Sequence, residues 1–173
     1  MEFFVLRDKF SKALSNVTKA ISAKVSLPIL QNVLIEEDSG RLKLTATDLD
    51  KSVITWIGAK IEGDIESTTI PAKPLQSFVS SLNDDQIGGV ISGDKLKIQS
   101  KTAKATFNGI SSKEYPNLDY SISDNYFELN LSVLKEAVSH TYFSTSLDET
   151  KPLWTGILIK LVGDTLHIVG PVS

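Results

Sequence analysis

The sequence repeats itself at an offset of 124 residues. When the chain is slid by that distance, "LPILQNVLIEEDSGRLKL" (residues 27–44) lies over "KPLWTGILIKLVGDTLHI" (residues 151–168) without a gap. Across residues 3–46 and 127–170 there are eight identities in 44 pairs, and the apolar positions also agree. A repeat of this kind predicts a chain built from similar domain modules that follow one another.

A smaller repeat, about half a module long, lies within the first copy. Alternating apolar residues predict short strands at 3–6, 29–36, 41–46, 53–57, 88–91, 96–100 and 103–107. One helix is expected after Asp8, which we predict as its N-cap, and a second after "TTIPAKP", with Pro74 in its first turn. The half-length repeat gives the order strand, helix and three strands twice before Gly109, with the strand before the second helix expected from the repeat alone. The short hairpin turns predict antiparallel sheets of an α+β fold.

The stretch "SSKEYPNLD", residues 111–119, has the character of a connector. It is poor in apolar residues, and its proline favours an extended backbone at the residue before it. We therefore expect a complete first domain at 1–120 and the start of a second at 121–173. The second copy stops soon after "LHIVG", which favours an N-terminal fragment of a longer protein or an altered terminus.

Composition excludes several classes of site. The chain has no cysteine, which rules out disulfides and thiolate metal ligands and fits a reducing compartment. The N-terminus lacks the pattern of a signal peptide, and no segment approaches the length of a membrane span. We expect a cytoplasmic protein without membrane association, metal or other cofactor.

The strongest functional signal is a local excess of positive charge. Four lysines and no acidic residue lie between Lys9 and Lys24, although the whole chain has a net charge of −3. At 3.6 residues per turn, Lys9, Lys12 and Lys19 share one helical face, opposite the apolar stripe. The outward face of the second helix carries Lys73 and serines. Such faces suit sequence-independent contact with phosphates, and the absence of arginine forks argues against base reading. A solvated face of an ordinary amphipathic helix would show a similar pattern.

A carboxylate pair offers a weaker alternative. Asp48 and Asp50 in "TDLD" could bind a divalent metal or perform acid–base catalysis, but aspartate is also a favoured turn residue. We interpret the pair as turn chemistry. The sequence contains no glycine-rich phosphate loop, nucleophile elbow or zinc-ligand spacing, so we predict neither an enzyme nor a metal site.

Five stretches together resemble one protein family: "LPILQNVLI", "LTATDLD", "TTIPAKPLQSF", "EYPNLD" and "LKEAVSHTYFSTSLDETKPLWTGILI". In this order they are similar to the bacterial replicative sliding clamp, the beta subunit of DNA polymerase III, from residue 1 to about 170. The resemblance implies the DNA-clamp fold, in which two chains of three similar domains form a ring around duplex DNA. It also implies a processivity factor without an active site, which slides on DNA in the bacterial cytoplasm, at the nucleoid during replication, and tethers the polymerase.

The resemblance also implies roles for individual residues. Lys24 stands where the family has a basic DNA-contacting residue, commonly arginine, and Lys73 occupies a basic position on a channel helix. Lys151, in "DETKPLW", is implied to lie near DNA. Trp154 stands where an apolar residue helps to form the cleft for partner peptides, although the family usually has a smaller residue there. Together with Lys9, Lys12 and Lys19, these are the expected site residues.

Partners follow from the same resemblance. They are duplex DNA, a second clamp chain, the polymerase and the clamp loader. Because the remainder of domain two and all of domain three are missing from this sequence, we expect the fragment not to close a normal ring. It should either stay monomeric or self-associate through unpaired strands. The alternative function is a non-specific module that binds double-stranded DNA or another polyanion through its lysine-rich segment.

Overall fold

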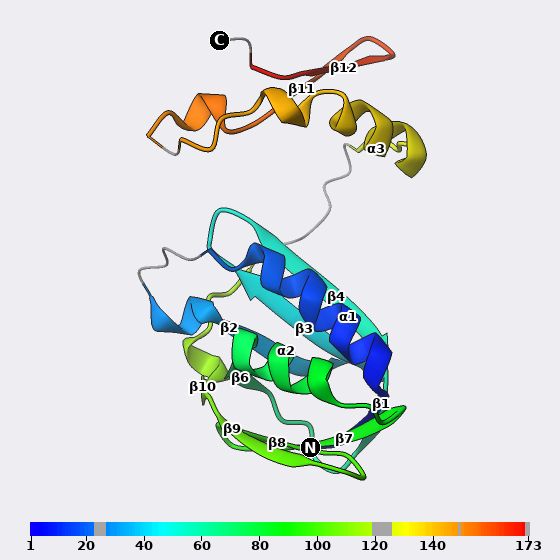
Figure 1. The fold of residues 1–173 in the computed structure, drawn as a ribbon, viewed down its shortest axis with the longest axis vertical. Coiled ribbons are helices and arrows are strands. Elements are labelled where there is room, and N and C mark those ends of the chain that lie inside the picture. The colour runs from blue at the N-terminus through cyan, green and yellow to red at the C-terminus, as the bar shows by residue number, and fades with distance from the viewer. Residues whose placement is uncertain (23–26, 119–125, 149, 172–173) are drawn as a thin grey trace. The chain divides into compact units, whose positions relative to one another are not determined.

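The computed structural model describes residues 1–22, 27–118, 126–148 and 150–171. Figure 1 shows that the chain consists of two compact units, residues 1–118 and 119–173. Within the described ranges, no helix has both the length and the apolar composition that crossing a lipid bilayer requires. The first unit contains most of the regular structure and the whole of the hydrophobic core.

Two five-stranded antiparallel sheets and two helices make up the first unit. Its elements, in chain order, are β1 (Glu2–Leu6), α1 (Arg7–Val17), η1 (Thr18–Ala20), η2 (Pro28–Gln31), β2 (Asn32–Asp38), β3 (Arg41–Thr47), β4 (Ser52–Gly58), β5 (Lys60–Glu62), β6 (Thr68–Pro71), α2 (Ala72–Ser81), β7 (Gln86–Ser92), β8 (Lys95–Gln99), β9 (Lys104–Asn108), β10 (Ile110–Ser111) and η3 (Ser112–Glu114). One sheet has the order β5-β1-β7-β8-β9 and the other β10-β6-β2-β3-β4. The prediction of an α+β fold with antiparallel sheets and two helices in the first unit is confirmed.

The two sheets have the same construction, with the halves of the unit exchanged. Each strand of the first sheet has a counterpart in the second sheet at the same place in the order. β5 corresponds to β10, β1 to β6, and the run β7-β8-β9 to the run β2-β3-β4. Each sheet therefore consists of a three-strand meander from one half and the leading and closing strands of the other. The half-length repeat seen in the sequence thus corresponds to a two-fold pseudosymmetry within the unit.

Strand register follows the same symmetry. Leu6, just before α1, pairs with Gln86 at the start of β7, and Pro71, just before α2, pairs with Asn32 at the start of β2. Gly89 lies opposite Phe3 in this register, and a Cβ at Gly89 would come within 2.1 Å of the Phe3 ring. The absence of a side chain at residue 89 therefore makes room for the buried aromatic ring.

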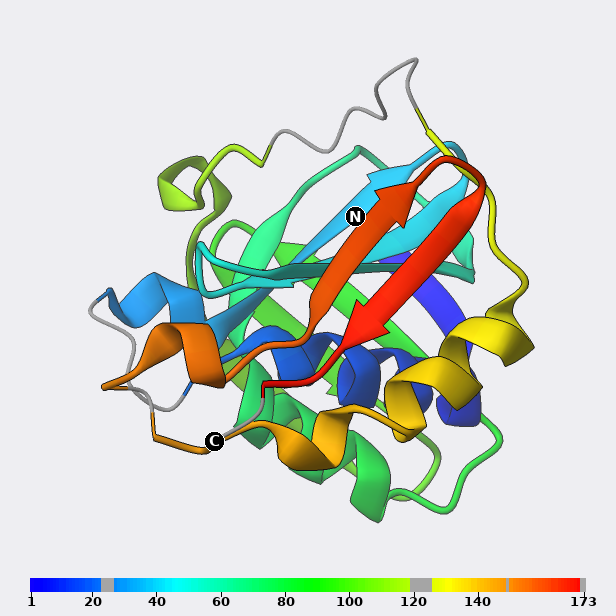
Figure 2. The same cartoon turned by 90° about the horizontal axis from the view of Figure 1, so that it is seen from above.

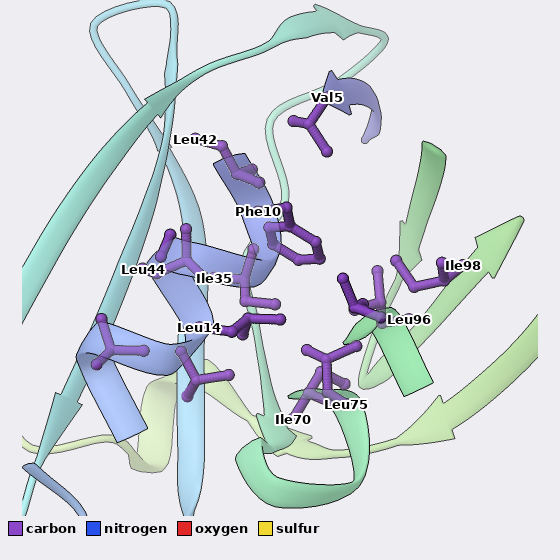
Figure 3. Packing of buried hydrophobic residues seen from close by; sticks show 14 of the residues in the cluster. Val5, Phe10, Leu14, Ile35, Leu42, Leu44, Ile70, Leu75, Leu96 and Ile98 are labelled. Carbon is purple, nitrogen blue, oxygen red and sulfur yellow. The ribbon is translucent and has the colours of Figure 1, made fainter. Parts of the chain in front are cut away.

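The main hydrophobic core lies between the sheets and the helices. Phe10 and Leu14 of α1 meet Leu75 of α2 there, together with side chains from both sheets, and all three are fully buried (Figure 3). Phe3 and Phe10 contact edge to face at 6.0 Å between ring centroids. Because both halves contribute to one core, their packing stabilises the unit as a whole.

The predicted boundaries of two elements are wrong. Helix α1 begins at Arg7 with Leu6 at the N-cap, and Asp8, predicted as the cap, instead pairs with Arg7 at 2.8 Å within the first turn. A carboxylate there still interacts favourably with the helix dipole. The residues after Pro28 form the short helix η2 rather than a strand, because Leu30 donates a backbone hydrogen bond to Leu27. Strand β2 consequently starts at Asn32.

The connector is fixed to the first unit by Tyr115. Its ring is buried against Ile29 and Leu30 in a small second cluster, and its hydroxyl donates to the Thr45 carbonyl at 3.3 Å. Burial disfavours the phenolate and raises the pKa of Tyr115 to about 12. The polypeptide that leaves the first unit therefore packs against the outer side of the β2–β3 pair.

Raising the pH is expected to weaken the first unit through Tyr115. The pKa of this phenol is about 10 in the unfolded chain and about 12 in the folded one, so the unfolded state loses its proton first. The protonated phenol therefore makes its full contribution to the free energy of unfolding below pH 10. This contribution, up to roughly 2 kcal/mol, is lost as the pH rises from 10 to 12. Urea unfolding of the Tyr115→Phe variant should show a shallower decline over this interval than the parent. An equal slope for both proteins would contradict the assignment.

The second unit repeats the first half of the first unit. It contains α3 (Leu131–Ser139), η4 (Tyr142–Ser144), η5 (Pro152–Trp154), β11 (Leu158–Val162) and β12 (Thr165–Val169). The elements α3, η4, η5 and β12 begin 124 positions after the starts of α1, η1, η2 and β3, respectively. Strand β11 lies within the range expected from β2. The 124-residue repeat read from the sequence is confirmed. Residues 126–130, the counterpart of β1, form no strand, since β1 pairs with β5 and β7, whose counterparts would lie beyond residue 173.

Candidate nucleic-acid interface

The helices α1 and α2 lie side by side, as Figures 1 and 2 both show. Ser11, in the first half of α1, is hydrogen-bonded to Ser80, near the end of α2, with 3.2 Å between their hydroxyl oxygens. The helices are therefore antiparallel, and small polar side chains let them approach closely. Lys19, just after α1, and Lys73, in the first turn of α2, consequently lie toward the same end of the pair.

Amphipathic spacing explains why the lysines face outward. In α1 the buried residues are Phe10, Ala13, Leu14 and Val17, which form one stripe toward the core. In α2 the stripe consists of Ala72, Leu75 and Val79, and Pro74 stands in the first turn, where its missing N–H costs no helical hydrogen bond. The remaining positions of both helices are left for polar side chains.

Those polar positions form the lysine face, which consists of Lys9, Lys12, Lys19 and Lys73. All four side chains are exposed. The side-chain ion pairs found among described residues involve Arg7, Lys43, Lys51 and Lys60, and none includes a member of the lysine face. Asp8 is the only acidic residue of the two helices, and its carboxylate is paired with Arg7. The face thus presents uncompensated positive charge.

Hydroxyl groups extend the lysine face along α2. Ser77, Ser80 and Ser81 are all exposed, although Ser81 donates to the Phe78 carbonyl at 2.7 Å and Ser80 contacts Ser11. Ammonium and hydroxyl groups without arginine forks can contact phosphate oxygens but do not discriminate between bases. Lys24, an expected member of the site, lies outside the described residues.

A cavity of about 460 Å³ lies beside Lys73, and the sequence did not predict it. Its lining comes from η2, the start of α2 and the β9–β10 corner, with Pro28, Pro71 and Pro74 among the apolar contributors and Asn108 among the polar ones. The lining segments lie far apart in the sequence, so the cavity exists only in the folded domain and no local sequence pattern predicts it. The three prolines restrict the backbone around the cavity.

In the second unit, Lys151 and Trp154 lie on one turn. The Lys151 ammonium stands 5.7 Å from the centre of the Trp154 ring, in the range of a cation–π contact. The Trp154 backbone N–H donates to the Lys151 carbonyl at 2.9 Å. The structure therefore brings together the expected DNA-near lysine and the expected cleft residue. Trp154 is 40% exposed, whereas its counterpart Leu30 in the first unit is buried.

Asp48 and Asp50 behave as turn residues. The Asp48 carboxylate accepts from the Lys51 backbone N–H at 3.0 Å and from the Lys51 ammonium at 2.6 Å. Burial alone would raise the pKa of Asp48, but these hydrogen bonds outweigh it and leave the pKa lowered. The described part of the chain contains no cluster of three or more acidic or histidine side chains suited to a metal ion. Asp48 therefore stabilises the β3–β4 turn, and Asp50 is an exposed residue of the same turn.

The first unit thus combines two sheets related by pseudosymmetry with a pair of antiparallel helices that present lysines and hydroxyls. This combination defines a domain of the DNA-clamp class. Residues 1–119 match the family described as "DNA polymerase III beta subunit, N-terminal domain". The chain belongs to this family.

Relatives and solved structures agree with this assignment. The "Beta sliding clamp" of Synechococcus elongatus is 34% identical over 170 residues, which cover 96% of this chain and 45% of the relative. The corresponding protein of Halalkalibacterium halodurans is 31% identical and is covered to 44%. The DNA polymerase sliding clamp of Bacillus subtilis superposes with a TM-score of 0.86 at 26% identity, over 98% of this chain and 47% of that one. The chain therefore spans about 45% of the length of these curated relatives.

Proposed function

We propose that the chain is the N-terminal part of a replication processivity factor. In this proposal the complete protein is a ring of two chains with three similar domains each. It encircles duplex DNA and tethers the replicative polymerase, in the bacterial cytoplasm and at the nucleoid during replication. Residues 1–120 are domain one, and residues 121–173 are the first part of domain two. The partners are a second clamp chain, the polymerase and a clamp loader.

The observation that carries the proposal is the unpaired charge of the lysine face. Sliding requires attraction to phosphates that does not depend on sequence and does not hold the protein at one place. Exposed ammonium groups on flexible side chains meet this requirement, since each can exchange one phosphate for the next. We assign DNA contact to Lys9, Lys12, Lys19, Lys24 and Lys73.

The second unit receives two further assignments under the same proposal. Lys151 contacts DNA near the channel, and Trp154 contributes to a cleft that receives peptides of polymerase or loader subunits. Their cation–π contact would couple the two roles, because a phosphate that draws Lys151 away from the ring exposes more of Trp154. The proposed protein acts by encircling and tethering, and we assign it no active site of its own.

A chimaeric clamp tests the function directly. Residues 1–118 of this chain would replace the matching N-terminal part of the Synechococcus elongatus clamp, which would then be assayed with the loader and polymerase of that organism on primed circular DNA. Long products should form as with the parent clamp, because the first unit folds as a complete domain with its own core. A chimaera that is folded and dimeric but leaves the polymerase distributive would contradict the proposal.

Linear DNA separates the proposal from the alternative of a general polyanion-binding module. A ring segment should bind a linear duplex only weakly at about 0.15 M salt, because few phosphate contacts survive screening. An independent binding module should instead hold the duplex at this ionic strength. Fluorescence anisotropy of a labelled linear duplex, titrated with the 173-residue chain at several salt concentrations, distinguishes the two.

A further inference from the structure

The outer face of the β5-β1-β7-β8-β9 sheet carries neighbouring apolar side chains. In this sheet Val5 and Ile98 point into the core (Figure 3). Because successive side chains alternate along a strand, Phe4 lies on the opposite face, and so does Val90, which precedes the core residue Ile91. Phe4 is half-buried and Val90 is 39% exposed. An antiparallel sheet normally presents polar residues to water, so apolar neighbours on this side favour an interaction site.

A missing side chain opens a groove between these strands. Phe4, Gly88 and Gln99 lie opposite one another on β1, β7 and β8. Since glycine has no side chain, this row has a gap at its centre, and a Cβ there would lie 3.3 Å from the Phe4 ring. The Phe4 ring therefore forms one apolar wall of a cavity of about 390 Å³, which we call the β7 groove. Its lining includes Glu2, Phe4, Gly88, Val90, Lys97 and Lys101.

Positive charge lies along one side of the β7 groove. Lys97 on β8 and Lys101 just after that strand are both exposed. Neither lysine forms an ion pair with a described residue. Glu2, on the β1 side, is the only acidic residue among the described ones that line the groove. The two sides therefore differ in charge, and the β8 side attracts carboxylates.

The spacing of these groups defines a sequence pattern for the ligand. Lys101 lies four residues after Lys97, which corresponds to a separation of up to roughly 13 Å along an extended chain. An extended peptide beside β8 would therefore meet the lysines with acidic residues four positions apart. Gln99, midway between the lysines, pairs with Gly88. The residue midway between the two acids shares their face of the peptide and lies over Gly88, where a large apolar side chain can pack against Phe4.

We propose that the β7 groove binds an extended segment of a partner protein with the pattern acid, any residue, large apolar residue, any residue, acid. Lys97 and Lys101 bind the two carboxylates, and the central side chain fills the space beside Phe4. Glu2 repels a nucleic acid strand, which is charged at every nucleotide, and so favours a peptide ligand. The helices α1 and α2 pack against the core, on the other side of this sheet. Binding in the groove is therefore independent of DNA contact by the lysine face.

Peptide selection tests the sequence pattern. Random linear peptides displayed on phage would be selected against the 173-residue chain. The enriched sequences should share two acidic residues four positions apart with a large apolar residue midway. A fluorescently labelled copy of the enriched peptide should bind with an affinity that falls as the salt concentration rises. Replacing its central apolar residue with serine, or both acids with their amides, should weaken binding at least about 10-fold.

Variants of the chain test the location of the site. Lys97→Glu combined with Lys101→Glu should weaken binding of the labelled peptide at least about 10-fold, because both carboxylates would meet like charge. The control combines Lys113→Glu with Lys135→Glu, which changes the net charge equally at exposed positions outside the groove. This control should bind within about two-fold of the parent. Amide chemical shifts of the isotopically labelled chain should change mainly in β7 and β8 when the peptide is added.

Several results would overturn the proposal. One is a selection that enriches no sequence, or only sequences without acidic residues. Others are equal peptide affinities of the two double variants, or chemical-shift changes confined to other strands or to the helices. Displacement of the peptide by a short single-stranded oligonucleotide would show that the groove takes nucleic acid instead. A dimer of the chain alone that Lys97→Glu and Lys101→Glu dissociate would show that the occupant is a second copy.

Discussion

Reversing the charge of Lys9, Lys12 and Lys73 to glutamate is expected to reduce duplex DNA binding by the 173-residue chain at least about 100-fold at low ionic strength. Each lysine contributes about one phosphate contact in the proposed interface, and each glutamate adds repulsion. The slope of log binding constant against log salt should fall by roughly three, at about 0.9 per contact. Fluorescence anisotropy with a labelled duplex at several low salt concentrations provides both quantities.

The control for this experiment is a second triple variant with the same net charge as the first. Lys97, Lys101 and Lys113 are exposed and lie outside the helix pair, on β8, in the β8–β9 turn and in η3. Their replacement by glutamate changes the net charge equally but should alter binding no more than a few-fold. If both triple variants lose binding to the same extent, overall charge rather than the lysine face determines affinity.

A methyl group at residue 89 is expected to have the largest effect on stability. Gly89→Ala should lower the free energy of unfolding of the first unit by about 3 kcal/mol, because the new Cβ would come within 2.1 Å of the buried Phe3 ring. Phe3 is fully buried and contacts Phe10, so the ring cannot move aside without disturbing the core. A loss of this size is a large part of the stability of a typical domain.

The neighbouring glycine is a matched control. A Cβ at Gly88 would lie 3.3 Å from the edge of the Phe4 ring, which is only half-buried and can shift. Gly88→Ala should therefore change the free energy of unfolding by less than about 1 kcal/mol. Urea unfolding followed by circular dichroism measures both variants, and equal midpoints for the two would show that the close approach at Gly89 is relieved without cost.

Periodicity was sufficient to predict the elements that bury one regular face. The spacing of Phe10, Leu14 and Val17 predicted α1, and alternation predicted most strands of both meanders within a few residues. No range was predicted for the short strands β5, β6 and β10, because runs of two to four residues such as Lys60–Glu62 carry no detectable alternation. The strand geometry of β5 and β10 comes from their neighbours β1 and β6.

The exchange of strands between the two halves could not be predicted from local patterns. That β1 pairs with β7 depends on contacts such as Phe3 against Gly89, which have meaning only once the register is known. For the lysine face, the sequence predicted the outward positions on each helix. The antiparallel approach marked by Ser11 and Ser80 was not predictable, since neither serine belongs to an apolar stripe.

Strand exchange also sets the order of events during synthesis. Strand β1 is among the first residues to leave the ribosome. It can pair first with the three-residue strand β5, but its longer pairing is with β7, which begins at Gln86. At a translation rate of about 5–20 residues per second, β1 waits roughly 4–17 s for β7. During that interval Phe3 and Val5 are accessible to chaperones. The first unit should therefore acquire protease resistance in one step, only after the nascent chain has extended past β9.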